Sequence, residues 1–369
     1  MLLEHASRWG SLVLDVEGQT SLMDTRVGDI LGRVGDMTRL RRLEIENLGK
    51  GAEPWFTVLE IMTRSIPQSV AASVNVTELG LLSHKEHRDS LVETGVDLSP
   101  FLCPNLTLIR AHVVPRVAVK IQNVCPSLVN AEFEFTVPLR KSIKGWSLGP
   151  VLHHRLSHLS MRTSPCPAVQ PRRSFPHDVF SAILDHVVCP SLSSITIQTA
   201  ASCPVRPMGV DGPADETEYM KNLEATSPSN DNDDGNPEHV ATSLNPFFPS
   251  SLIDFVSTCP SLQMLDLDGF SLPSSSHLIR LLEITPTLTD LRVWEVVEEK
   301  SARESDTSDP SGLACDDWLC WLENKNHLPL LRHLKLNMVQ KPRAAGSLER
   351  LLGILVDSGR LKSAVINYR

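Results

Sequence analysis

The residues that could do metal chemistry in this sequence are few and poorly spaced. His154 and His158 lie four positions apart, as two ligands on one turn of a helix would. They flank the start of a predicted strand, however, where side chains four apart do not converge. Ligation by this pair, or by His84 and His87, would also need a carboxylate or thiol partner held in a fixed frame. We therefore expect no metal site.

Motifs for nucleotide binding and hydrolysis are missing as well. Gly49-Lys50-Gly51 lacks the spacing of a phosphate-binding loop and is typical of a turn. The sequence contains no Gly-x-Ser-x-Gly segment, and no serine, histidine and aspartate stand out as a triad. We therefore expect no enzyme activity and no cofactor.

Four of the eight cysteines occupy one recurring position, directly before the proline of a repeated Pro-x-Leu segment. They are Cys103, Cys125, Cys189 and Cys259. This regularity predicts small buried thiols at a repeated tight turn, and not disulfides. Reduced cysteines favour an intracellular location, in the cytoplasm or nucleus.

The segment around each of these cysteines belongs to an internal repeat. The clearest copy, residues 260–267, has the frame Pro-x-Leu-x-x-Leu-x-Leu, and eleven copies keep its three apolar positions. Successive copies start roughly 22 to 43 residues apart, except for one step of about 70 that has room for a further copy. The apolar triplets are Trp9/Leu12/Leu14, Leu40/Leu43/Ile45, Val76/Leu79/Leu81, Leu106/Ile109/Ala111, Leu128/Ala131/Phe133, Leu156/Leu159/Met161, Leu192/Ile195/Ile197, Leu262/Leu265/Leu267, Leu288/Leu291/Val293, Leu331/Leu334/Leu336 and Leu361/Ala364/Ile366.

Each copy predicts a strand, and the segments between copies predict helices. The last two apolar positions alternate with period two, which gives a short strand with one buried face. Apolar stripes of helical spacing lie at residues 179–188, 277–284 and 347–356, with shorter ones at 55–62 and 318–322. A proline follows the stripes at 179–188 and 277–284, and it ends a helix because it lacks an amide proton and disfavours the α conformation in the residue before it. Repeated helix–turn–strand units predict an α/β leucine-rich-repeat solenoid, a horseshoe with short parallel strands on the concave face and helices outside.

Two acidic segments interrupt the predicted array of residues 1–369. Residues 204–242 are rich in Pro, Asp, Asn, Ser and Glu and are expected to be disordered, since they have little to bury. Residues 298–312 are expected to form a shorter acidic loop. Residues 211–238 carry a net charge of −8 and residues 298–309 one of −3, out of −9 for the whole chain. The remaining body is close to neutral, so we expect no binding to nucleic acid or to a membrane surface.

The residues between the leucines form the predicted binding surface. In each strand they project from the face opposite the core, and stacking of the repeats aligns them. Trp294 is the expected anchor, because an exposed tryptophan is costly unless a partner or a loop such as residues 298–312 covers it. The predicted partner-binding residues are Arg110, His112, Arg162, Asp266, Asp268, Asp290, Arg292, Trp294, His333 and Lys335.

The Cys-Pro-x-Leu-x-x-Leu-x-Leu frame resembles the cysteine-containing leucine-rich repeats of F-box proteins. The opening residues 4–14, with Arg8 and Trp9, look like the arginine–tryptophan segment that starts the repeat region of many fungal F-box proteins. The resemblance implies a non-catalytic interaction scaffold, the substrate-receptor part of a ubiquitin-ligase adaptor, whose protein partner would be a ubiquitination substrate. Docking to the ligase would require an F-box upstream of the first repeat. The alternative is a stand-alone leucine-rich-repeat binding or inhibitor protein with no link to ubiquitin.

Overall fold

The structure, a computed structural model, divides into a first unit of Met1–Ala200 with Asn245–Arg369 and a second of Ala201–Leu244, which lies outside the described residues. Every residue described below belongs to the first unit. Three segments for which the sequence makes predictions lie outside the described residues. They are 204–242, 298–312 and 55–62. The structure describes residues 5, 7–15, 37–48, 75–83, 105–113, 115–136, 149–164, 176–199, 248–268, 275–295, 321–322, 324, 327–338 and 345–368.

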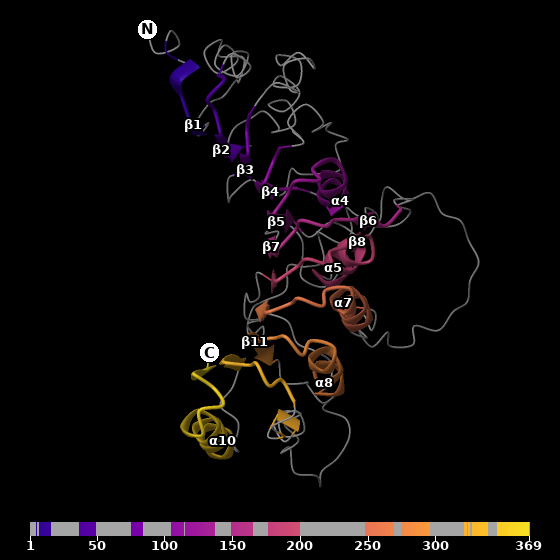
Figure 1. The fold of residues 1–369 in the computed structure, drawn as a ribbon, viewed down its shortest axis with the longest axis vertical. Helices are drawn as coiled ribbons and strands as arrows, with labels where there is room; N and C mark the ends of the chain where they lie inside the picture. The colour runs from indigo at the N-terminus through magenta and orange to yellow at the C-terminus, as the bar shows by residue number, and fades with distance from the viewer. Residues whose placement is uncertain are drawn as a thin grey trace, which may run out of the picture. The chain divides into compact units, whose positions relative to one another are not determined.

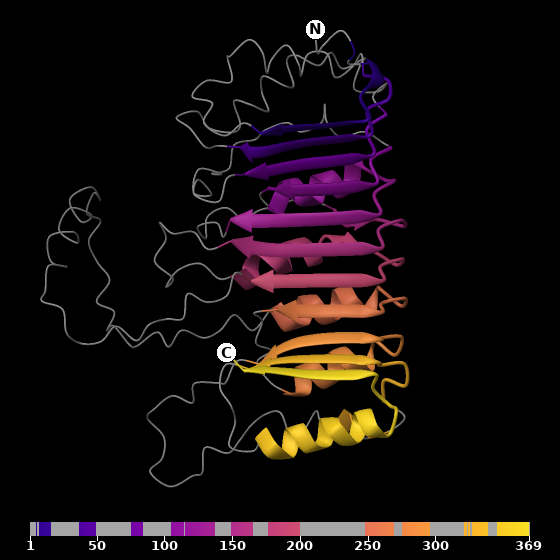
Figure 2. The same cartoon turned by 90° about the vertical axis from the view of Figure 1, so that its left-hand side faces the viewer.

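A single parallel sheet of eleven strands dominates the described residues (Figure 1, Figure 2). The strands lie in the sheet in the order of the chain. They are β1 (Ser11–Asp15), β2 (Arg42–Leu48), β3 (Glu78–Ser83), β4 (Leu108–His112), β5 (Asn130–Thr136), β7 (His158–Ser164), β9 (Ser194–Thr199), β10 (Met264–Asp268), β11 (Asp290–Glu295), β12 (His333–Met338) and β13 (Ser363–Tyr368). The protein is therefore an α/β protein with a long parallel sheet, consistent with a repeat-type fold.

The pairing of the strands aligns the repeat positions that the sequence predicts. Leu265 pairs with Leu291 and Leu267 with Val293, and the second and third apolar positions of the other copies are matched in the same way. The matched residues run as two continuous columns, Leu12, Leu43, Leu79, Ile109, Ala131, Leu159, Ile195, Leu265, Leu291, Leu334, Ala364 and Leu14, Ile45, Leu81, Ala111, Phe133, Met161, Ile197, Leu267, Val293, Leu336, Ile366. The predicted strand positions and register are thus confirmed. The long step, which has room for a further copy, adds no strand to the sheet, because β9 pairs directly with β10.

A hydrogen-bonded turn precedes most of the strands. The amide of the first leucine donates to the carbonyl three residues earlier, across the proline, in Leu128–Cys125, Leu192–Cys189 and Leu262–Cys259, each at 3.1 Å. Proline suits the second position of such a turn because its φ is already fixed and its missing amide proton is not needed. Leu331 makes the same bond to Leu328 around Pro329 at 3.1 Å.

Helices cover one side of the sheet (Figure 1). They are α4 (Pro115–Val124), α5 (Pro176–Leu184), α7 (Phe248–Ser257), α8 (Ser275–Glu283) and α10 (Ala345–Asp357). The predictions for residues 277–284 and 347–356 are confirmed as α8 and α10, and α4 packs on α5, α5 on α7 and α7 on α8.

The helix predicted at residues 179–188 ends earlier than expected. α5 stops at Leu184, and Val187–Val188 form a short strand, β8, that pairs with β6 (Val151–Leu152). The amide of Val151 donates to the carbonyl of His186 at 2.7 Å. This pairing, together with the β-branched valines, outweighs the helical apolar stripe.

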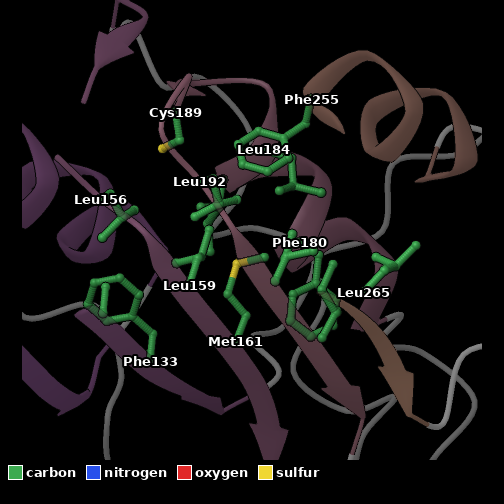
Figure 3. Packing of buried hydrophobic residues seen from close by; sticks show 14 of the residues in the cluster. Phe133, Leu156, Leu159, Met161, Phe180, Leu184, Cys189, Leu192, Phe255 and Leu265 are labelled. Atoms are coloured by element: carbon green, nitrogen blue, oxygen red, sulfur yellow. The ribbon is translucent and has the colours of Figure 1, made fainter. Parts of the chain in front are cut away.

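The core lies between the helices and the sheet. Phe133, Met161 and Phe180 are each at most 2% exposed, and Figure 3 shows them in one layer between β5, β7 and α5. The rings of Phe135 and Phe180 meet edge to face, with centroids 6.4 Å apart. Aromatic pairs of this geometry add to the stability that burial of their area provides.

Candidate functional site: the polar face of the sheet

We call the sheet surface on the side opposite the core the polar face. Its residues alternate with the buried columns along each strand, so the register aligns them as well. The middle position of each strand, between the two buried columns, is occupied in order by Val13, Glu44, Gly80, Arg110, Glu132, Ser160, Thr196, Asp266, Arg292, Lys335 and Val365. This row contains charges of both signs, hydroxyls, a glycine and two valines, whereas the buried columns are uniformly apolar.

The structure brings most of the predicted binding residues together on this face. Arg110, Arg162, Arg292 and His333 are exposed, and Asp290 and Lys335 are half-buried. Their strands stack in register, so that Asp290 lies beside His333 and Arg292 beside Lys335. The backbones of Asp268 and Trp294 belong to β10 and β11, but their side chains lie outside the described residues.

Two of the predicted binding residues are buried, which corrects the expectation that they are free to contact a partner. Asp266 is 4% exposed and His112 is 3% exposed. Asp266 is short, and the longer side chain of its register neighbour Arg292 extends to it. His112 is the last residue of β4. It lies opposite Glu134 of β5, and β5 continues beyond that pair to Thr136.

Arg292 and Asp266 form an ion pair across β10 and β11. The Arg292 Nη1 donates to Asp266 Oδ2 at 3.2 Å, and the two side chains are 48% and 6% exposed. The carboxylate therefore fixes one edge of the guanidinium, which has further N–H donors. Asp266 positions Arg292, and Arg292 is the residue of the pair that a partner can reach.

A second charged group lies at the β2–β3 end of the face. Arg42 pairs with Glu44 in the same strand, and this hydrogen bond raises the pKa of Arg42. The Glu44 side chain is only 8% exposed and extends over Gly80 of the next strand. A Cβ at Gly80 would lie 2.7 Å from Glu44 Cγ, so the glycine makes room for this carboxylate.

Strands β1 to β5 give the face an acidic bias. Arg110 and Glu132 form an ion pair at 3.3 Å in which both side chains are nearly half-exposed. On these strands, acidic residues outnumber the two arginines, Arg42 and Arg110. The six acidic residues are Asp15, Glu44, Glu46, Glu78, Glu132 and Glu134. At the β12–β13 end of the face, two uncharged side chains form a hydrogen bond: Asn367 Nδ2 donates to Asn337 Oδ1 at 2.8 Å.

The cysteines lie away from this face, at the turns. Cys125, Cys189 and Cys259 are buried thiols that form no disulfide, as predicted, while Cys103 lies outside the described residues. Burial raises the pKa of Cys259 to about 11, and it raises the pKa of Cys189 further. Since the thiolate is the reactive form, burial makes Cys189 and Cys259 poor nucleophiles.

His153 occupies the corresponding turn position between Cys125 and Cys189. Its ring is 2% exposed; Nδ1 accepts from the Leu156 amide at 3.1 Å, so Nε2 is the protonated nitrogen and donates to the Cys125 carbonyl at 3.0 Å. Burial lowers the pKa of His153, which stays neutral. The signal missed in the sequence was the His-x-x-Leu spacing, which matches the Cys-x-x-Leu spacing of the other turns.

The neighbouring histidines do not complete a metal site. His154 is exposed, and the exposed His158 lies on the polar face with Nδ1 2.7 Å from Ser157 Oγ. Within the described residues there is no group of three side chains suited to hold a metal ion.

Comparison with known proteins gives no family for this chain. No protein-family model matches it, and no similar sequence is found among curated proteins. In the part of the chain that the structure describes, no helix is both long and apolar enough to cross a membrane.

Proposed function

We propose that the chain is a leucine-rich-repeat solenoid whose polar face binds a protein partner. The observation that carries this proposal is the register of eleven strands, which sets chemically varied side chains in line on one face of the sheet. Arg162, Arg292, His333 and Lys335 extend from neighbouring or nearby strands, with Asp290 among them. Arginine is enriched in protein interfaces and among the residues that contribute most to binding.

The activity that we propose is binding alone, with no reaction. The thiols of Cys189 and Cys259 have raised pKa values, and the polar face holds ion pairs between Arg110 and Glu132 and between Arg292 and Asp266. The sequence resemblance to F-box proteins supplies the proposed biological role, in which the bound protein is presented to a ubiquitin ligase as its substrate.

The test is affinity capture with the intact chain from extracts of its source organism. The first variant, Arg162→Glu with Lys335→Glu, reverses two charges of the polar face. The matched control, Lys120→Glu with Arg280→Glu, makes the same charge change on exposed positions of α4 and α8, on the other side of the sheet. We expect a protein that the unaltered chain and the control retain and that the polar-face variant loses.

Two outcomes separate the parts of this proposal. A partner lost with the helix variant and kept by the polar-face variant would overturn the placement of the binding surface. Subunits of a cullin–RING ligase among the retained proteins would support the F-box role, and a partner retained without them would instead support a stand-alone scaffold.

A further inference from the structure

The last strand of the sheet, β13, has one side unpaired among the described residues. It pairs with β12 on one side, and no described strand lies on the other (Figure 2). Its sequence, Ser-Ala-Val-Ile-Asn-Tyr, contains no charged residue and no proline. Proteins usually protect sheet edges with such residues, because an open edge can pair with another chain.

Comparison with the other strands shows that this composition is unusual at an edge. In the eleven-stranded sheet, β9 is the one other strand without Asp, Glu, Lys or Arg, and it is paired on both sides. β1, at the opposite edge, ends on Asp15. β13 is therefore the edge that is suited to strand addition.

The apolar residues of β13 are also less covered than their counterparts in β12. Leu334 and Leu336 are 2% and 4% exposed, whereas their register partners Ala364 and Ile366 are only partly buried. Between them Val365, on the polar face, is 46% exposed. Burial of these side chains by a further strand would contribute hydrophobic stabilisation.

Helix α10, which packs on β13, extends the same apolar end surface. Its burial pattern repeats that of α8, so that Leu352, Ile354, Leu355 and Val356 take the places of Leu278, Arg280, Leu281 and Leu282. Ile354 is 56% exposed where α8 carries a charged residue, and Val356 is partly buried where Leu282 is 1% exposed. The uncovered surface thus includes helix and strand together.

We infer that this end surface pairs with a second copy of the chain, through antiparallel association of the two β13 strands. The strand is complementary to itself when Val365 is the centre of the pairing. Val365 then faces its own copy, Ala364 faces Ile366, and Ser363 faces Asn367. The two residues of each pair lie on the same face of the sheet and are either both apolar or both polar, and no like charges face each other.

A twofold arrangement fits better than a head-to-tail one. Antiparallel pairing uses the same edge of both copies and closes after two chains. Addition of β13 to β1 of the next copy would use both edges and continue without end. The two arrangements differ in their dependence on Val13, which occupies the middle position of β1 and is 49% exposed.

The test compares Val365→Lys with Val13→Lys in the intact chain, using light scattering and sedimentation over a wide concentration range. Both residues are about half-exposed valines at the same position of an edge strand, so both variants should fold. We expect the unaltered chain to form a dimer of 40.8-kDa subunits. Val365→Lys would place the new lysines of the two copies opposite each other and should raise the dissociation constant of the dimer about tenfold or more. Val13→Lys should leave the dissociation constant unchanged.

A cross-linking experiment fixes the register. Val365→Cys should form a symmetric disulfide between two chains under mild oxidation, since the two Cβ atoms face each other at the centre of the pairing. Val13→Cys should not. A chain that stays monomeric at every concentration would overturn the inference, and so would equal disruption by the two lysine variants, which would indicate head-to-tail growth.

Discussion

The two faces of the eleven-stranded sheet are built from the same strands and differ in how much their residues vary. On the core face, the two buried columns are apolar in all eleven strands, with members such as Phe133, Leu265 and Leu291. On the polar face, the middle positions of the strands hold acids, bases, hydroxyls, a glycine and, in the two edge strands, valines. The difference indicates that the repeat specifies the fold through one face and leaves the residues of the other face able to vary.

The sharpest contrast between the faces is expected at two adjacent residues of β5. Phe133→Ala removes a ring that is 2% exposed and should lower the free energy of unfolding by about 3–5 kcal/mol. Glu132→Ala removes a half-exposed partner of Arg110 and should change it by less than about 1 kcal/mol. Chemical denaturation measures both values. Equal costs would show that the two faces do not differ in this way.

The polar face is not free everywhere, and Gly80 tests where it is constrained. Gly80→Ala sets a methyl group against Glu44 Cγ and should destabilise the protein by about 1–2 kcal/mol. Gly10→Ala, with no atom within 4 Å of the added Cβ, should have little effect. The cost of Gly80→Ala should largely vanish in a Glu44→Ala background, and its persistence there would locate the strain elsewhere.

The ion pairs of the polar face should differ in strength according to burial. Arg292→Ala removes a partner of the buried Asp266 carboxylate and should cost about 1 kcal/mol, a value limited by the exposure of the arginine. Arg110→Ala, whose partner is nearly half-exposed, should cost less than about 0.5 kcal/mol. The free energies of unfolding of the two variants, measured at low salt, test this order.

His153 is a polar residue on the buried side, and its effect should appear only in acid. Above the ordinary histidine pKa of 6.5 the ring is neutral in both folded and unfolded chains and adds no pH dependence. Below it the unfolded state takes up a proton that the folded state binds less readily, so stability falls as the pH is lowered. Denaturation between about pH 7 and about pH 5 should show a smaller decline in His153→Gln than in the exposed control His154→Gln. Identical declines would refute a neutral, buried ring.

The strands could be predicted from the sequence because the triplet spacing determines which residues face the core. The helices were predicted less well. α4 was missed because its buried side is built from residues such as Ala118 and Val119 and not from leucines. The β6–β8 pair was missed because Val187 and Val188 fit a helical stripe, and only pairing with a distant segment makes them a strand.

The candidate site could be predicted in position but not in detail. Alternation along the strand places Asp266, Arg292 and Lys335 on the polar face, as the register confirms. The burial of Asp266 depends on the conformation of Arg292 in the next strand, which no pattern within one repeat contains. The same limit applies to Gly80, whose role depends on Glu44 of the preceding strand.

The most direct test of the central claim is an alanine scan along β11 and β12, with the unfolding free energy and the capture of the partner measured on each variant. We expect the effects to alternate along each strand with a period of two residues. Losses of stability should occur at Leu291, Val293, Leu334 and Leu336, which are at most 6% exposed. Losses of capture without large losses of stability should occur at Arg292 and Lys335. Stability and capture falling at the same residues, or capture unaffected by every polar-face change, would contradict the claim.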